Sequence, residues 1–171
     1  MKKSAITAIP SFFENYINCA PDLPILDALA ATSDLTHFIS GTSLEEKRDF
    51  AYAPEKWTVA QVLQHMIDTE RIFAYRALRF ARNDSTELPG FDEALFAENA
   101  PVGNRPVEQL LDEFSIVRRG TILLFSSFTQ EAMLRKGVCN HYMIDVLGIG
   151  FAAAGHVAHH INILKERYFL L

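Results

Sequence analysis

Histidine is the residue type in this sequence whose number and spacing best suit chemistry. Two of the six histidines, His156 and His160, stand four residues apart in an apolar segment near the C-terminus. On an α-helix, that spacing places their imidazoles within about 40° of each other and one turn apart, so both can reach one metal ion. A single histidine is more simply a surface residue or a hydrogen-bonded core group, but two buried imidazoles without partners are costly. The pair therefore predicts a metal site.

His65 is the candidate third ligand, because it lies among apolar neighbours in the middle of a long helical pattern. A facing helix can bring it opposite the first two histidines. Three protein ligands leave one coordination position open, which is typical of a catalytic rather than a structural zinc site. His159, three residues after His156, is an alternative to His160 as a ligand. Imidazole binds several divalent ions, so the sequence does not choose among Zn, Ni, Fe, Co or Mn.

Arg76 is a candidate catalytic residue, because it falls within about 20° of His65, three turns further along the same helix. From there its side chain can point toward an anionic substrate beside the metal. The other arginines of this helix, Arg71, Arg79 and Arg82, are more simply a solvated face paired with acidic neighbours.

Two common motifs fit the sequence less well. Residues 148–153 have the loose dinucleotide pattern G-x-G-x-x-A, but the strand that should precede it is not expected. Val157 stands where the zinc-protease pattern H-E-x-x-H has its glutamate. A metal site here would therefore have no adjacent carboxylate base.

Length and composition describe one globular domain over residues 1–171. The chain is 49% hydrophobic and 22% charged, and its net charge is −5 with no dense basic block, which argues against nucleic-acid binding. No apolar run is long enough to span a membrane or resembles a signal peptide. Cys19 and Cys139 are isolated, which fits a reducing compartment. We therefore expect a cytoplasmic protein.

Helical patterns dominate the sequence, and strand-like alternation is nearly absent. The strongest pattern begins at the capping box Thr58-Val-Ala-Gln61 and has good helix formers up to Arg82. A second capping box is expected at Ser43, and Asp145 is expected to cap the last helix. Helices are predicted at about residues 10–18, 25–39, 58–82, 106–128 and 146–167, with a short turn after 43, a long connection at 83–103 and a loop around Gly137 and Asn140. Four of these helices are long, which predicts an all-α four-helix bundle.

Several stretches also resemble the DinB/YfiT-like superfamily of metal-dependent four-helix-bundle proteins. They are Lys56-Trp-Thr-Val-Ala-Gln-Val-Leu-Gln-His65, Asp68-Thr-Glu-Arg-Ile-Phe-Ala-Tyr-Arg-Ala-Leu78, Leu88-Pro-Gly-Phe-Asp92 and Gly155-His-Val-Ala-His-His-Ile-Asn-Ile-Leu164. The resemblance extends from about Phe12 to Tyr168. It implies an up-down-down-up bundle, a metal held by His65, His156 and His160, and a homodimer. Relatives include transferases that use low-molecular-weight thiols such as bacillithiol or mycothiol, and a thiol-dependent isomerase.

The leading hypothesis is therefore a metal-dependent enzyme acting on a small molecule. For thiol S-transfer, Arg76 or a group near Asp92 would orient the electrophile beside a low-molecular-weight thiol. For hydrolysis, His141 would relay a proton. A non-catalytic metal or small-molecule binder and a bundle stabilised by its ion are the alternatives. Metal affinity should fall as the pH drops through the histidine range near about 6.5.

Extra apolar residues on the third long helix are consistent with the homodimer, although the same residues would also fit the interior of one subunit. They are Ile122, Leu123 and Phe125.

Overall fold

The computed structural model describes residues 1–171, and α-helices form most of its regular structure. The helices are α1 (Ser11–Cys19), α2 (Ile25–Ala31), α3 (Gly41–Glu46), α4 (Val59–Ala81), α5 (Glu93–Asn99), α6 (Val107–Ser126), α7 (Gln130–Met133) and α8 (Val146–Ile163). The strands are β1 (Lys136–Cys139) and β2 (Tyr142–Asp145), and α8 continues as a π-helical segment at Leu164–Phe169. Short 3-10 turns lie at Lys3–Ala5 and Leu35–His37. The all-α prediction is confirmed.

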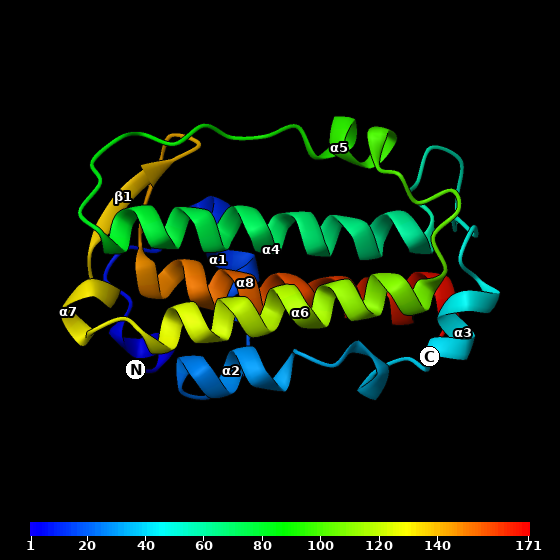
Figure 1. Cartoon of the computed structure of the whole chain (residues 1–171), viewed down its shortest axis with the longest axis horizontal. Coiled ribbons are helices and arrows are strands. Elements are labelled where there is room, and N and C mark those ends of the chain that lie inside the picture. Colours follow the sequence, from blue (N-terminus) through cyan, green and yellow to red (C-terminus); the bar gives the residue numbers. More distant parts are fainter.

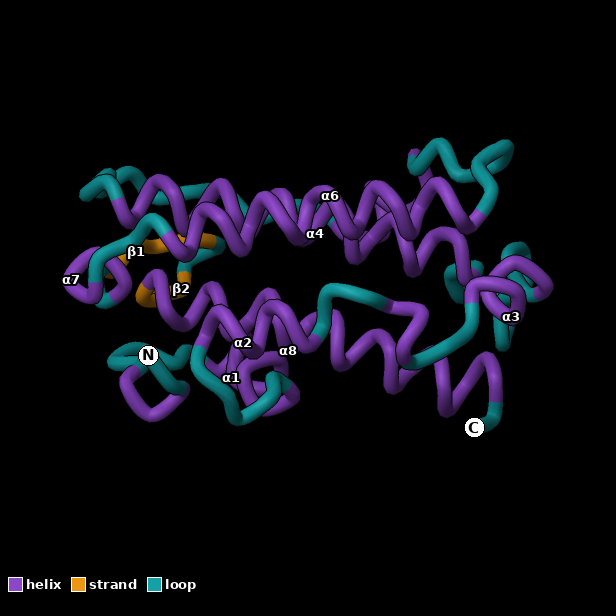
Figure 2. Tube along the Cα trace, turned by 60° about the horizontal axis from the view of Figure 1, so that its bottom comes forward, coloured by secondary structure: helices purple, strands orange, loops and turns teal.

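Four helices form the bundle, with the others around its ends and sides. Figure 1 shows α2 and α8 running in one direction and α4 and α6 in the other, which is the up-down-down-up order. Figure 2 shows α4 and α6 as one layer and α2 and α8 as the other. Because α4 and α6 are parallel, residues 82–106 must cross the length of the bundle, and they carry α5 on the way. The predicted four-helix bundle is therefore confirmed.

The start and end of α4 follow from local sequence. The Thr58 hydroxyl accepts from the Gln61 N–H at 3.2 Å, and the Gln61 side chain accepts from the Thr58 N–H at 2.9 Å, which confirms the capping box. Asn83 ends the helix with a positive φ of 62°. Apolar residues that recur mostly at three- and four-residue steps give α4 one buried face: Val62, Met66, Phe73, Ala77 and Phe80.

Helix α2 is shorter than the predicted 25–39. It ends at Ala31, because the next side chains bond to backbone groups that a longer helix would use. The hydroxyl of Thr32 donates to the Ala28 carbonyl at 3.2 Å, and Asp34 accepts from the N–H of Thr36 at 2.9 Å. The predicted capping box at Ser43 is also wrong, since α3 begins two residues earlier, with Ser40 as its cap.

The loop predicted around Gly137 and Asn140 is a β-hairpin. Strands β1 and β2 pair antiparallel, with Cys139 opposite Tyr142. Asn140 and His141 form the two-residue turn, with φ of 49° and 66°. Such a turn requires positive φ at both central residues, and Asn tolerates it well. The four-residue strands are too short for their alternation to be visible in the sequence.

A buried ion pair joins all four bundle helices. The Arg118 guanidinium on α6 lies 2.9 and 3.0 Å from the two carboxylate oxygens of Glu70 on α4, and both side chains are almost fully buried. Its Nη1 donates to the Thr32 hydroxyl at 2.7 Å, after α2, and the Nη2 that bonds Glu70 also donates to the Ala153 carbonyl at 3.3 Å, on α8. The bundle is therefore closed at its centre by one arginine as well as by apolar packing.

Helix α1 packs across α8 where α8 has Gly155. A Cβ at this position would lie 1.7 Å from the Tyr16 carbonyl oxygen, a backbone atom that cannot move aside alone. Gly155 therefore allows α1 to lie against α8, one residue before the first histidine of the C-terminal pair.

We expect Gly155→Ala to lower the free energy of unfolding by roughly 1–3 kcal/mol, since α1 must shift to admit the methyl group. The measurement is urea unfolding of each variant. Gly120→Ala is the matched control: a Cβ on exposed Gly120 meets nothing within 4 Å, so this change should stabilise α6 by up to about 1 kcal/mol. Equal effects of the two changes would contradict the proposed role of Gly155.

The three apolar residues of α6 that were considered for a homodimer interface differ in their burial. Phe125 is in the core, Ile122 is partly buried and Leu123 is 62% exposed. The homodimer stays a prediction, which sedimentation over a wide concentration range would test. None of the helices is both long enough and apolar enough to cross a membrane.

Candidate metal centre

Three histidines from two helices meet inside the bundle. The Nε2 atom of His156 on α8 lies 3.0 Å from Nε2 of His65 on α4 and 3.1 Å from Nε2 of His160. One ligand atom from each ring lies within 4.8 Å of the others, and all three side chains are buried. The structure thus brings together the three predicted ligands. His159 is outside this group, and its ring packs 5.5 Å from that of Tyr16.

The donor set fits a divalent metal ion. Nitrogen ligands at about 2.0–2.1 Å from a tetrahedral ion are about 3.3–3.4 Å apart, close to the two Nε2 separations observed. Without an ion, the ring nitrogens of the cluster cannot all form good hydrogen bonds. His156 Nε2 faces two other ring nitrogens, and each such contact needs one donor and one acceptor. One cation accepting three lone pairs resolves that conflict.

Burial keeps these imidazoles in the neutral form that binds metal. Desolvation lowers the pKa of His65 to about 4. Desolvation, and then repulsion from the neighbouring histidines, holds the pKa values of His156 and His160 well below the usual range. The three rings are therefore deprotonated at neutral pH, and a metal ion would not have to displace protons from them.

These pKa directions change the expected pH profile of metal binding. The sequence alone places the loss of affinity near about 6.5, whereas a folded site with lowered pKa values should keep its affinity below that pH and lose it toward about 4. Chelator-competition titrations with Zn between pH 7.5 and 4.5 would measure this. A tenfold weakening between pH 7 and 6 would contradict it.

Aromatic rings enclose the three histidines. The ring of Trp57 lies 4.8 Å from that of His65, and the rings of Tyr16 and Phe73 lie 5.1 and 6.0 Å from that of His156. Such a surround lowers the local dielectric and strengthens electrostatic interactions with any ion held there. Tyr16 belongs to α1, which Gly155 holds against α8, so the N-terminal helix forms one wall of the centre.

Two hollows adjoin the histidines from different sides. The first, the aromatic cleft, has a volume of about 240 Å³ and reaches His160; its lining residues are Tyr52, Glu55, Lys56, Trp57, Val62, His160, Ile163, Arg167 and Tyr168. The second, the Arg76 hollow, is more enclosed and has a volume of only about 20 Å³; its lining residues are Phe12, Tyr16, Thr69, Phe73, Arg76, Gly90, Phe91, Glu93, Asn140 and His156. Each hollow thus reaches one of the three histidines, and the aromatic cleft is by far the larger.

The candidate catalytic residues lie at different places. Arg76 is 4% exposed and lines the same hollow as His156. Asp92 is exposed, and its carboxylate accepts from the Leu95 N–H at 3.0 Å as the cap of α5. His141 is also exposed, in the hairpin turn, with its Nδ1 2.9 Å from a carboxylate oxygen of Glu87. Neither Asp92 nor His141 lines the two hollows.

Sequence reasoning missed several residues around the centre. Tyr16 and Glu93 come from short helices far away in sequence, and nothing in their own neighbourhoods signals a site. Glu93 is the one carboxylate lining the Arg76 hollow, and burial raises its pKa. Thr69 is a polar residue that interrupts the buried apolar positions of α4, and it lines the Arg76 hollow.

Among solved structures, the fold resembles that of YfiT from Bacillus subtilis, described as a probable metal-dependent hydrolase with an unusual four-helix bundle topology. The TM-score is 0.65 and the sequence identity 19%, over 95% of this chain and 91% of that one. Comparison with curated proteins finds no match. The family model of the DinB superfamily matches residues 28–164, which include His65, His156 and His160. The chain therefore belongs to the DinB superfamily.

Proposed function

We propose that this protein is a metal-dependent enzyme acting on a small molecule, with His65, His156 and His160 as the metal ligands. The observation that carries the proposal is the convergence of three buried Nε2 atoms. They face one another, and no other hydrogen-bond donor or acceptor pairs with them. A divalent ion bound there would act as a Lewis acid and lower the pKa of a nucleophile beside it. Three ligands leave room for that nucleophile, as in catalytic zinc sites.

The chain's own residues have separate tasks in this proposal. The three imidazoles hold the ion from two helices, so their positions are fixed by the bundle. The aromatic cleft beside His160 admits the substrate, with Trp57 and Tyr168 as apolar walls. Lys56 and Arg167 line the cleft with one carboxylate, Glu55, so its charged groups carry a net positive charge.

Thiol transfer is the reaction we favour. The side-chain contacts around the three histidines include no carboxylate hydrogen-bonded to any of them, so a base that deprotonates water would have to be a residue that does not bond the imidazoles. A low-molecular-weight thiol needs less help, because its pKa of about 8–9 is several units below that of water and a nearby cation lowers it further. Arg76 is our candidate for orienting the electrophile.

Hydrolysis is the second candidate. It is favoured by the description of YfiT as a probable metal-dependent hydrolase and by Glu93, whose carboxyl lines the hollow next to His156 and has a raised pKa. A carboxylate with a raised pKa is a better general base near neutral pH. Glu93 would act there in place of the absent zinc-protease glutamate.

The test compares the two nucleophiles in Co-loaded protein. Adding 2-mercaptoethanol should produce a sulfur-to-metal charge-transfer band, and the band should be absent in His156→Ala. A spectrum unchanged by thiol, together with hydrolysis of simple ester substrates that Glu93→Gln abolishes, would favour hydrolysis. Protein that binds Co but shows neither behaviour would be a non-catalytic binder, and the enzyme proposal would be wrong.

A further inference from the structure

Arg76 is buried without a counter-ion. Its side chain donates one hydrogen bond, from Nη2 to the Pro89 carbonyl at 2.9 Å, and no carboxylate lies within 4.0 Å. Arg118, the other deeply buried arginine, forms an ion pair with Glu70 and hydrogen bonds to groups on or next to α2 and α8. Burying a guanidinium that lacks such partners costs free energy, unless a bound anion pairs with its charge. Burial also lowers the pKa of Arg76, which reflects the same lack of compensation.

A second polar group in the Arg76 hollow also lacks a partner. The Oγ1 atom of Thr69 is buried and makes no hydrogen bond, although most buried hydroxyls do. Thr69 and Arg76 lie seven residues apart on α4, about two turns, so their side chains share one face. A guanidinium and a hydroxyl that face one hollow make a donor set suited to oxygen anions.

The shape of the hollow limits what can enter it. Its volume of about 20 Å³ suits one or two polar atoms and excludes a whole metabolite. Gly90 lines it on the outer side, and a Cβ there would lie 2.4 Å from the side-chain oxygen of Asn140, so the lining is tightly packed. Carboxylate is planar, is smaller than phosphate and can accept two parallel hydrogen bonds from one arginine.

We propose that the Arg76 hollow is a subsite for a carboxylate end of the substrate, next to the metal centre. Because His156 lines the same hollow, a ligand anchored at Arg76 lies next to one of the three histidines. That the anion bound here belongs to a substrate rests on the proposed function. It predicts that the substrate is a carboxylic acid, with the reacting group near the metal and the anion held by Arg76 and Thr69.

The experiment is an acetate titration of metal-free protein, followed by NMR at the guanidinium Nε–H signals of its arginines. In wild type, acetate should shift the Arg76 signal in a saturable way. In Arg76→Met the Kd should rise by at least about tenfold, as expected for loss of a charge-assisted hydrogen bond. Because this variant has no Arg76 signal, its binding is followed through the backbone amides of residues 69–76. Arg76→Lys keeps the positive charge but loses the two parallel N–H donors of the guanidinium, so it should give an intermediate Kd.

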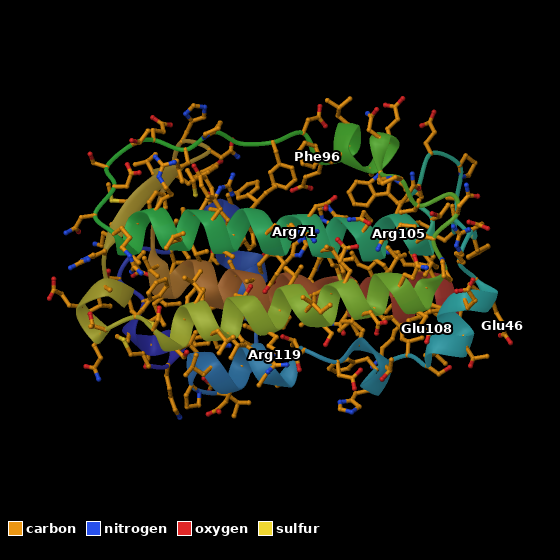
Figure 3. All side chains as sticks on the ribbon, in the orientation of Figure 1. Glu46, Arg71, Phe96, Arg105, Glu108 and Arg119 are labelled. Carbon is orange, nitrogen blue, oxygen red and sulfur yellow. The ribbon has the colours of Figure 1, made fainter.

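Two further variants sharpen the comparison. Arg71→Met removes the same charge from the same helix, but Arg71 pairs with Glu113 at the surface between α4 and α6 (Figure 3), so acetate binding should not change. Glu93→Gln removes the one carboxylate lining the hollow and should tighten binding. Circular dichroism and melting of each variant confirm that folding is intact; if Arg76→Met does not fold, Thr69→Val and Glu93→Gln carry the test.

The outcomes separate this assignment from the proposed function. Acetate binding that is absent, or equal in wild type and Arg76→Met, would overturn the subsite whether or not the protein binds metal. Tighter Arg76-dependent binding of inorganic phosphate than of acetate would overturn the carboxylate assignment. Acetate binding in a protein that never binds Zn or Co would support the anion site and contradict the proposed metal-dependent enzyme.

Discussion

Bound zinc should fall from about one ion per chain to near zero when His65, His156 or His160 is replaced by alanine. Each Nε2 atom is one of three converging donors, and an ion left with two ligands loses a large part of its binding free energy. Elemental analysis of protein reconstituted with Zn and dialysed measures the content. Melting temperature with and without Zn gives a second readout, since an ion that binds only the folded state raises it.

His37→Ala is the matched control for metal content. His37 is exposed, its Nε2 lies 3.2 Å from an Asp34 carboxylate oxygen and it is not part of the cluster, so zinc content should not change. His159→Ala tests the neighbouring ring, which is outside the cluster and should cost much less than His160→Ala. If wild type retains no metal and added Zn or Ni leaves its melting temperature unchanged, the metal assignment is wrong.

Replacing Arg118 by methionine should lower the free energy of unfolding by about 3–5 kcal/mol, because it leaves Glu70 charged and buried without a partner. The same change removes the bonds to Thr32 and Ala153, so contacts to α2 and α8 weaken together. Urea unfolding, with the slope compared between variants, measures the loss.

The double variant with Glu70→Leu and Arg118→Met should be more stable than Arg118→Met alone, since no unpaired charge then remains. The difference distinguishes a charge penalty from lost packing. A double variant no more stable than the single one would mean that the ion pair contributes little beyond the volume of its side chains.

The long helices of this bundle could be predicted from sequence because their signals are local. Helix α4 has a capping box at one end, good helix formers throughout and one apolar face, and these agree. Helix α2 could not be bounded in the same way, because Thr32 and Asp34 are compatible with a helix until their own hydrogen bonds are known. The hairpin depends on positive φ angles at Asn140 and His141, which the spacing of apolar residues in the sequence does not reveal.

The metal centre was predictable in part for the same reason. The spacing of His156 and His160 is a property of one helix, whereas His65 lies on another. Its apolar neighbours made His65 a candidate ligand, and the family resemblance implied the same three histidines. The hollows were not predictable. The Arg76 hollow is built from α1, α4, α5, α8 and the hairpin turn, and it is an anion site only because Arg76 has no counter-ion and Thr69 Oγ1 has no hydrogen-bond partner.

The parallel arrangement of α4 and α6 has a consequence for the order in which the chain folds. Neighbouring helices here cannot pair as simple hairpins: Glu70 and Arg118 are 48 residues apart, and His65 and His156 are 91 apart. Contacts of long sequence separation close large loops and slow folding. During synthesis, no metal centre can exist until α8 has left the ribosome and packed between helices made earlier. Metal capture is therefore a late event, and it should select chains whose bundle is already closed.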